Sequence, residues 1–144
     1  MSTARMSAAT SGTSLSFPAY RCAHAGYEPA IRMSDLLPFR TIAYNNAWAT
    51  HRLLTACLAL TPDEFTARRT GFFPSLRATL NHILIIDHFY VDAMEGGTLG
   101  PAAWANQEPC STVAALKQAQ AAVDRRLLKI VEALNGAGLQ RIVA

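Results

Sequence analysis

The stretch TLNHILIIDHFYVDAMEGG, Thr79 to Gly97, combines an apolar run with two histidines and ends in two glycines. The helical spacing of its apolar side chains predicts a helix that begins near Ser75. We expect this helix to end at Gly96 and Gly97, because a residue without Cβ readily takes the left-handed conformation that closes a helix. At a rise of about 1.5 Å per residue, the helix would be roughly 30 Å long.

One further helix is predicted upstream of this stretch and another downstream. The upstream helix runs from about Pro38 to Leu60, and its inner side chains recur at the spacing of a helix face. They are Phe39, Ala43, Asn46, Thr50, Leu53 and Cys57. The downstream helix runs from about Thr112 to Leu134 and is ended by Asn135 and Gly136. Its inner side chains form a bundle seam of Val113, Leu116, Gln120, Val123, Leu127, Ile130 and Leu134.

The connections between these helices contain turn residues and no strand pattern. Residues Thr61 to Glu64 match a capping box with proline at the first helical position, which predicts a short helical turn. Residues 67–74 are expected to form a loop, and residues 96–110 a long connection with a brief turn around Trp104. The expected fold class is therefore all-α, a bundle of three long helices.

Composition narrows the class of protein further. The chain of 144 residues fits one domain. Residues 1–32 are rich in Ser, Thr, Ala and Gly, so we expect a disordered or loosely packed N-terminal extension before a bundle at 33–144. The net charge is +3 and much of it lies in that extension, so we expect no nucleic-acid partner. Three cysteines without a CxxC pair suggest a reducing cytoplasm, and Asp87 and Asp92 interrupt the apolar run too early for a membrane span.

The two histidines of the central helix are expected to lie on different faces. His82 and His88 are six positions apart, which is about 120° around a helix, so they cannot bind one ion together. A helical projection places His82 inward and puts His88, Asn81 and Leu84 on a stripe that faces water. An inward imidazole needs a partner. Two interpretations of His82 remain open: a core histidine bonded to a neighbouring group, or a metal ligand.

Other candidate residues are weaker. His51 is expected at the boundary of the upstream helix, and His24 lies in the N-terminal extension. Asn46, on the inner face of the upstream helix, needs hydrogen-bond partners and could support a site. Cys57 on the same face is expected to be a small core residue.

Three segments together resemble the DinB family of metalloenzymes. The segment YNNAWATHRLL, Tyr44 to Leu54, is similar to the family's first helix, and RTGFFPSLRATLNHIL, Arg69 to Leu84, is similar to the entry to its second helix. The third segment is DHFYVDAMEGG, residues 87–97. The resemblance covers about Met33 to Leu134 and, in the third long helix, rests on the apolar pattern alone.

The resemblance implies an up-and-down four-helix bundle that holds a divalent metal with three histidines. One of these lies on the second helix, and an HxxxH pair lies on the last. His82 matches the first position, and the long connection at residues 96–110 matches the family's crossover. The sequence contains no HxxxH, and it stops where the last helix is expected. We therefore expect three of the usual four helices, with His82 as the matched ligand for nickel, zinc or manganese.

Two functions follow as hypotheses. The first is a DinB-type metal-dependent enzyme, a transferase, isomerase or hydrolase acting on a small-molecule or thiol substrate and impaired by its missing ligands. The alternative is a non-catalytic helical interaction module, or a truncated inactive homologue. An absent helix would leave an apolar groove that invites association. We expect a homo-oligomer, most simply a dimer.

Overall fold

The computed structural model describes residues 33–140 and shows an all-α fold, with no strand in that range. Three long helices dominate: α1 (Met33–Cys57), α3 (Leu76–Glu95) and α4 (Val113–Ala133). Three short helices join or follow them: α2 (Pro62–Thr66), the 3-10 helix η1 (Gly100–Trp104) and α5 (Gly136–Leu139). The predicted fold class is confirmed. The expected extension at residues 1–32 lies outside the described residues.

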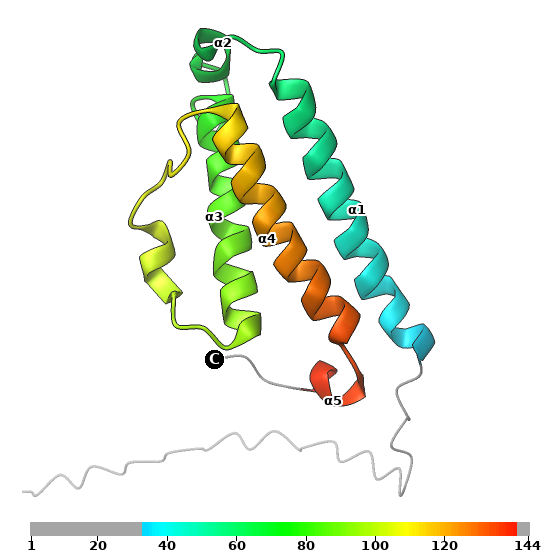
Figure 1. Cartoon of the computed structure of the whole chain (residues 1–144). Coiled ribbons are helices and arrows are strands. Elements are labelled where there is room, and N and C mark those ends of the chain that lie inside the picture. The colour runs from blue at the N-terminus through cyan, green and yellow to red at the C-terminus, as the bar shows by residue number, and fades with distance from the viewer. Residues whose placement is uncertain (1–32, 141–144) are drawn as a thin grey trace, which may run out of the picture.

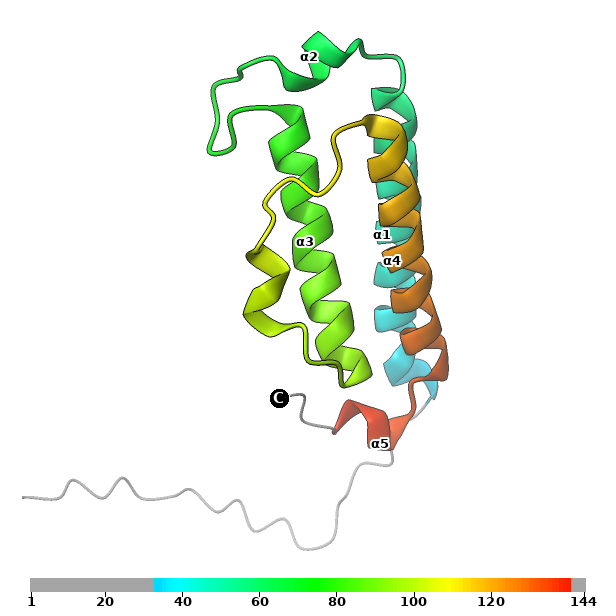
Figure 2. The same ribbon diagram turned by 60° about the vertical axis from the view of Figure 1, so that its left-hand side comes forward.

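The long helices lie side by side, with α4 in contact with both α1 and α3 (Figures 1 and 2). Direct packing between α1 and α3 is slight. Figure 1 shows that the segment containing η1 carries the chain from the lower end of α3 back to the upper end of α4. Helices α3 and α4 therefore run parallel, and α1 runs opposite to both. None of the helices within 33–140 combines the length and apolar character needed to cross a bilayer.

The helix ends follow the capping signals in the sequence. The side chain of Ser75 accepts a hydrogen bond from the backbone N–H of Ala78 at the start of α3. At the other end of α3, Gly96 has φ of 81°, the left-handed conformation expected there. Thr61 and Glu64 form the predicted capping box of α2. Helix α1 differs from the prediction, because it begins at Met33 and contains Pro38.

The core lies between α4 and its two neighbours and is closed at the upper end by Phe65 of α2. Leu54, Leu84, Leu116 and Val123 are each at most 2% exposed. The predicted water-facing stripe of α3 was wrong, because Asn81 and Leu84 are fully buried. The segment after α3 packs over that side of the helix, which a projection of the isolated helix could not show.

Candidate functional site

A cluster of polar side chains lies inside the bundle, on the side of α4 that faces the two other long helices. Gln120 and Asp124, one turn apart on α4, are 2% and 7% exposed. The Nε2 atom of Gln120 donates to Oδ2 of Asp87 on α3 at 2.6 Å and to Oδ1 of Asp124 at 3.2 Å. One amide nitrogen therefore bridges two carboxylates from different helices.

Helix α1 joins the same cluster. The hydroxyl of Thr50 donates to Asp124 at 2.7 Å, and Nδ2 of Asn46 donates to Asp124 at a longer 3.5 Å. The prediction that Asn46 lies on an inner face and needs partners agrees with its partly buried position. Asp124 thus links α1 to α4, while Gln120 links α3 to α4. Because buried polar groups are costly unless satisfied, this network favours one alignment of the three helices.

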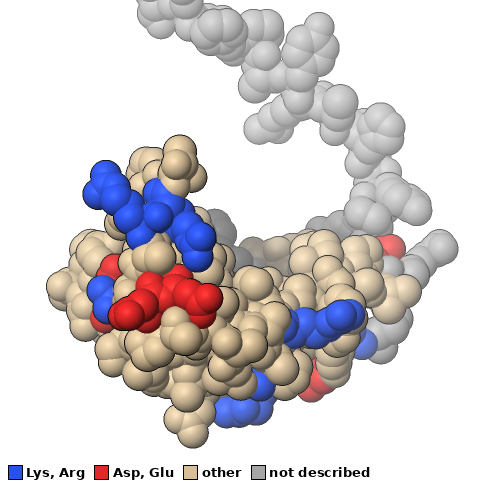
Figure 3. All heavy atoms as spheres, turned by 90° about the horizontal axis from the view of Figure 1, so that it is seen from above, with Lys and Arg blue, Asp and Glu red and all other residues tan. Residues whose placement is uncertain are grey.

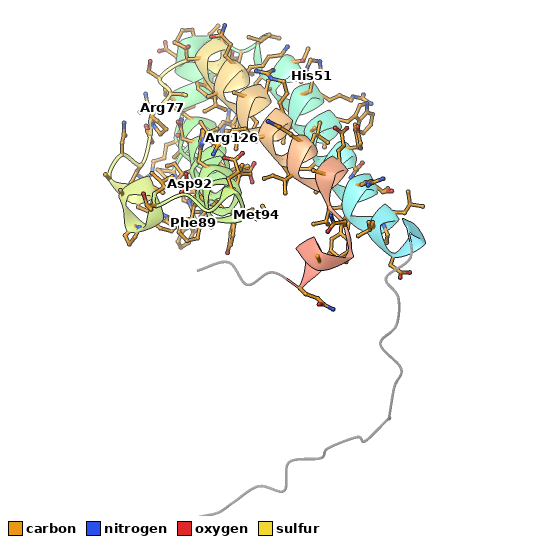
Figure 4. All side chains as sticks on the ribbon, turned by 60° about the horizontal axis from the view of Figure 1, so that its bottom comes forward. His51, Arg77, Phe89, Asp92, Met94 and Arg126 are labelled. Atoms are coloured by element: carbon orange, nitrogen blue, oxygen red, sulfur yellow. The ribbon has the colours of Figure 1, made fainter. Side chains whose placement is uncertain are left out.

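The cluster opens into a groove between α1 and α3 that is floored by α4. The groove has a volume of about 350 Å³. Its walls are apolar except for Asn46 and Asp87 at its inner side. The apolar lining consists of Phe39, Ile42, Ala43, Met94, Leu127 and Val131. Met94 extends from α3 toward this space (Figure 4). The groove could accept an apolar helix or an apolar ligand with a hydrogen-bond donor.

The electrostatics of the cluster centre on Asp87. Burial raises the pKa of its carboxyl group, and the nearby charge of Asp124 raises it further. The hydrogen bond from Gln120 acts in the opposite direction. The ionised form of Asp87 is therefore less favourable in the fold than in water. Asp87 also lines the groove, so a molecule that enters the groove would contact it.

His82 lies away from this cluster. It is nine positions before the buried Val91, so the two side chains project from nearly opposite sides of α3. Its ring is partly buried and packs against the ring of Phe73, with centroids 4.5 Å apart. The ring is thus neither in the core formed by the buried residues of α3 nor in open solvent, and it lies against the loop before α3 rather than at the polar cluster. Neither ring nitrogen of His82 has a hydrogen-bond partner among residues 35–140.

The other histidines are also separated from His82. His88 is partly buried, and its Nδ1 lies 3.3 Å from Nη1 of Arg126, which forms an ion pair with Glu95 at 2.7 Å. Burial, followed by the charge of Arg126, lowers the pKa of His88. His51 is exposed on α1 (Figure 4). His24 lies outside the described residues.

The described residues do not fit a three-histidine metal centre. Within the described part of the chain, no three His, Cys, Asp or Glu side chains lie close enough to hold one ion. The polar cluster contributes only two carboxylates, and His82 packs against Phe73 elsewhere on α3. Any ion bound by His82 would need its other ligands from beyond these residues.

Sequence reasoning identified Asn46 but missed Asp87, Gln120 and Asp124 as a cluster. Gln120 carried a usable signal, since it is a polar residue in the middle of the apolar seam of α4. Asn46 occupies a similar position on α1. Two polar residues on facing seams indicate a buried polar contact between helices.

The fold and the site define a class: a helical bundle with a long crossover and a polar cluster beneath an open groove. The DinB family model matches residues 33–140, which is most of the chain, so this protein belongs to the DinB family. Neither the curated proteins nor the solved structures contain a match.

Proposed function

We propose that this protein is a DinB-family helical module that associates with a second copy of itself through the groove between α1 and α3. The observation that carries the proposal is an exposed seam on α1. Phe39, Ile42 and Leu53 are 47%, 67% and 48% exposed, and two of them line the groove. Together with Asn46 and Ala49, they recur at alternating spacings of three and four residues. That spacing is typical of helices that pair with another helix.

A second copy is the occupant that this seam fits best. Asn46 lies midway between Phe39 and Leu53, so an antiparallel pair of α1 helices would place Asn46 beside Asn46 of the second copy. A two-fold interface uses the same surface on both chains. Such a pair would cover both grooves at once, and a polar Asn in an apolar seam favours a single alignment.

The test is the mass of the protein in solution, measured by sedimentation equilibrium. Ile42→Glu places a charge in the groove. Leu37→Glu is the matched control, because Leu37 is similarly exposed at 62% but lies about 140° away around α1. We expect the wild type and Leu37→Glu to dimerise, and Ile42→Glu to remain a helical monomer. A monomeric wild type, or equal dimerisation of both variants, would refute the proposal.

A second candidate function is the divalent-metal binding expected of the family, with His82 as one ligand. It is favoured by the ring nitrogens of His82, which have no protein hydrogen-bond partner among the described residues while the ring is only partly buried. The other ligands would come from outside residues 35–140. Metal-dependent chemistry on a small-molecule or thiol substrate would require that completed set.

The metal hypothesis is tested by the amount of nickel, zinc or manganese retained per chain after dialysis. The variants are His82→Ala and, as a control, His51→Ala, which removes an exposed histidine from α1. We expect His82→Ala alone to lose bound metal. Metal that stays in His82→Ala, or a wild type that retains none, would contradict the assignment of His82.

The cellular compartment and the class of partner are also part of this proposal. Cys57 and Cys110 are buried and free, which suits a reducing compartment such as the cytoplasm. Seen from above, basic side chains lie near acidic ones rather than forming one broad basic face (Figure 3). That distribution supports a protein or small-molecule partner over nucleic acid.

A further inference from the structure

We infer that association through the groove takes up a proton at Asp87 of each copy, so that dimerisation strengthens as the pH falls. This inference rests on the proposed self-association and assigns a regulation to the same groove. It follows from the position of one carboxylate and from the residues that a two-fold interface can offer it.

The first step concerns the hydrogen bonds of Asp87. Its side chain lines the groove, and Oδ2 accepts a hydrogen bond from Gln120 at 2.6 Å. No described residue donates to Oδ1, and this atom is not among the buried unpartnered atoms of the described residues, so it is open to water in the free chain. A helix laid in the groove removes that water. A buried carboxylate without a full set of partners is costly, and such groups commonly become neutral by taking up a proton.

The second step concerns what the second copy can supply. A two-fold interface brings the groove surface against itself, and the residues that line the groove include no Lys or Arg. The groove lining has two polar residues, Asn46 and Asp87. The polar groups that the second copy can bring to Asp87 from this lining are therefore its own Asn46 and its own Asp87. A neutral amide hydrogen bond replaces a full solvation shell only in part. The interface therefore favours the protonated carboxyl group.

The groups already facing Asp87 within its own chain act consistently with this. From α4, the negative charge of Asp124 raises the pKa of Asp87. From α1, Asn46 and Thr50 are neutral. On α3, the charge of His88 would favour the ionised carboxylate, but burial and Arg126 lower the pKa of His88 and so keep it mostly uncharged near neutral pH.

The size of the effect follows from proton linkage. If each copy takes up one proton on association, the association constant rises by up to about 100-fold per pH unit. This dependence holds between the pKa of Asp87 in the free chain, itself above its usual 3.8, and the still higher pKa in the dimer. Below both values, the dependence disappears because Asp87 is protonated in either state.

The experiment measures the dimer dissociation constant by sedimentation from neutral to mildly acidic pH for the full chain. Asp87→Asn removes the charge and keeps a side chain that can bond Gln120. Asp63→Asn is the control, since it removes a carboxylate from the exposed surface of α2. Far-UV circular dichroism at each pH verifies that all three proteins remain helical.

The expected result is tighter association at lower pH for the wild type and Asp63→Asn. Asp87→Asn should dimerise more tightly than either at neutral pH, with little pH dependence. A wild-type dimer whose dissociation constant is independent of pH would overturn the inference and leave the proposed dimer intact. Equal pH dependence in Asp87→Asn would also overturn it. Absence of any dimer in all three proteins would overturn the proposed function and the inference together.

Discussion

Replacing Asn81 should detach the crossover from α3 and destabilise the whole bundle. Asn81 is completely buried, and its amide bonds both backbone polar groups of Cys110. Its Nδ2 donates to the carbonyl of Cys110 at 2.9 Å, and its Oδ1 accepts from the N–H of Cys110 at 2.8 Å. Cys110 lies at the end of the crossover, just before α4. The side chain of Asn81 thus satisfies the backbone N–H and carbonyl of Cys110, which lie in a buried loop outside any regular secondary structure.

The magnitude follows from those two hydrogen bonds. In Asn81→Ala, the N–H and carbonyl of Cys110 both lose their partner, and each buried unsatisfied group costs about 1–3 kcal/mol. With two such groups, we expect the free energy of unfolding to fall by about 2–6 kcal/mol. For a domain of this size, a loss of about 3 kcal/mol corresponds to a fall in Tm of roughly 12 °C.

The assay is urea unfolding followed by circular dichroism, with amide hydrogen exchange as a local readout. Gln107→Ala is the control, because Gln107 is an exposed amide of the crossover that donates to the carbonyl of Trp104 at 3.0 Å. The control should change the unfolding free energy by less than about 0.5 kcal/mol. In Asn81→Ala the N–H of Cys110 should exchange much faster. A loss below about 1 kcal/mol, with that N–H still protected, would refute the role assigned to Asn81.

The variant Asn81→Asp tests the direction in which stability changes with pH. A carboxylate at this position can still accept from the N–H of Cys110, but it repels the carbonyl, and its burial raises its pKa in the folded state. The variant should therefore be least stable at neutral pH. It should recover as the pH falls through that raised pKa, because the protonated carboxyl can donate to the carbonyl. A variant whose stability falls steadily with acid would contradict this reasoning.

Three further predictions concern single positions, each measured by urea unfolding. Thr61→Ala removes the capping box of α2 and should cost about 1 kcal/mol, whereas Thr66→Ala on the same helix should cost less. Gly96→Ala should cost about 1 kcal/mol through its φ of 81° alone, since nothing lies within 4 Å of an added Cβ, while Gly71→Ala, without a positive φ, should be nearly neutral. Asp87→Asn should raise the free energy of unfolding at neutral pH, because the raised pKa of Asp87 means that the fold disfavours its ionised form. This gain in stability should vanish as the pH falls through the raised pKa toward 3.8. The first prediction would be contradicted if Thr61→Ala left the stability unchanged. The second would be contradicted if the two glycine variants cost the same, and the third if the gain in Asp87→Asn persisted in acid.

Most of the fold was predictable because local signals agree with the packing. The seam of α4, the capping box at Thr61 and the glycine at the end of α3 depend only on nearby residues, and each occurs as expected. The start of α1 was not predicted. Pro38 lacks a backbone N–H, yet in this helix it lies near the N-terminus, where the loss of one donor is tolerated.

The site was less predictable because its residues meet only through tertiary structure. The projection placed Asn81 and Leu84 on a stripe of α3 that faces water, yet both are buried. Two segments cover that helix, α4 on one side and the crossover on another, so its buried arc is wider than one apolar stripe. Asp87 appeared in the sequence only as an interruption of an apolar run. Its partner Gln120 lies on another helix, and no local pattern connects the two.

The polar cluster also explains why an open groove is compatible with a stable alignment of three helices. Helices α1 and α3 scarcely touch, so the spacing between them depends on the contacts that each makes with α4. Asp124 accepts from α1 through Thr50, and Gln120 donates to α3 through Asp87, so both connections pass through adjacent turns of α4. Asp124 is closed off from solvent, whereas Asp87 lines the groove. The ionisation of Asp87 is therefore the part of this network that an arriving helix can change, and any partner of the groove must either neutralise that carboxylate or bring a hydrogen-bond donor to it.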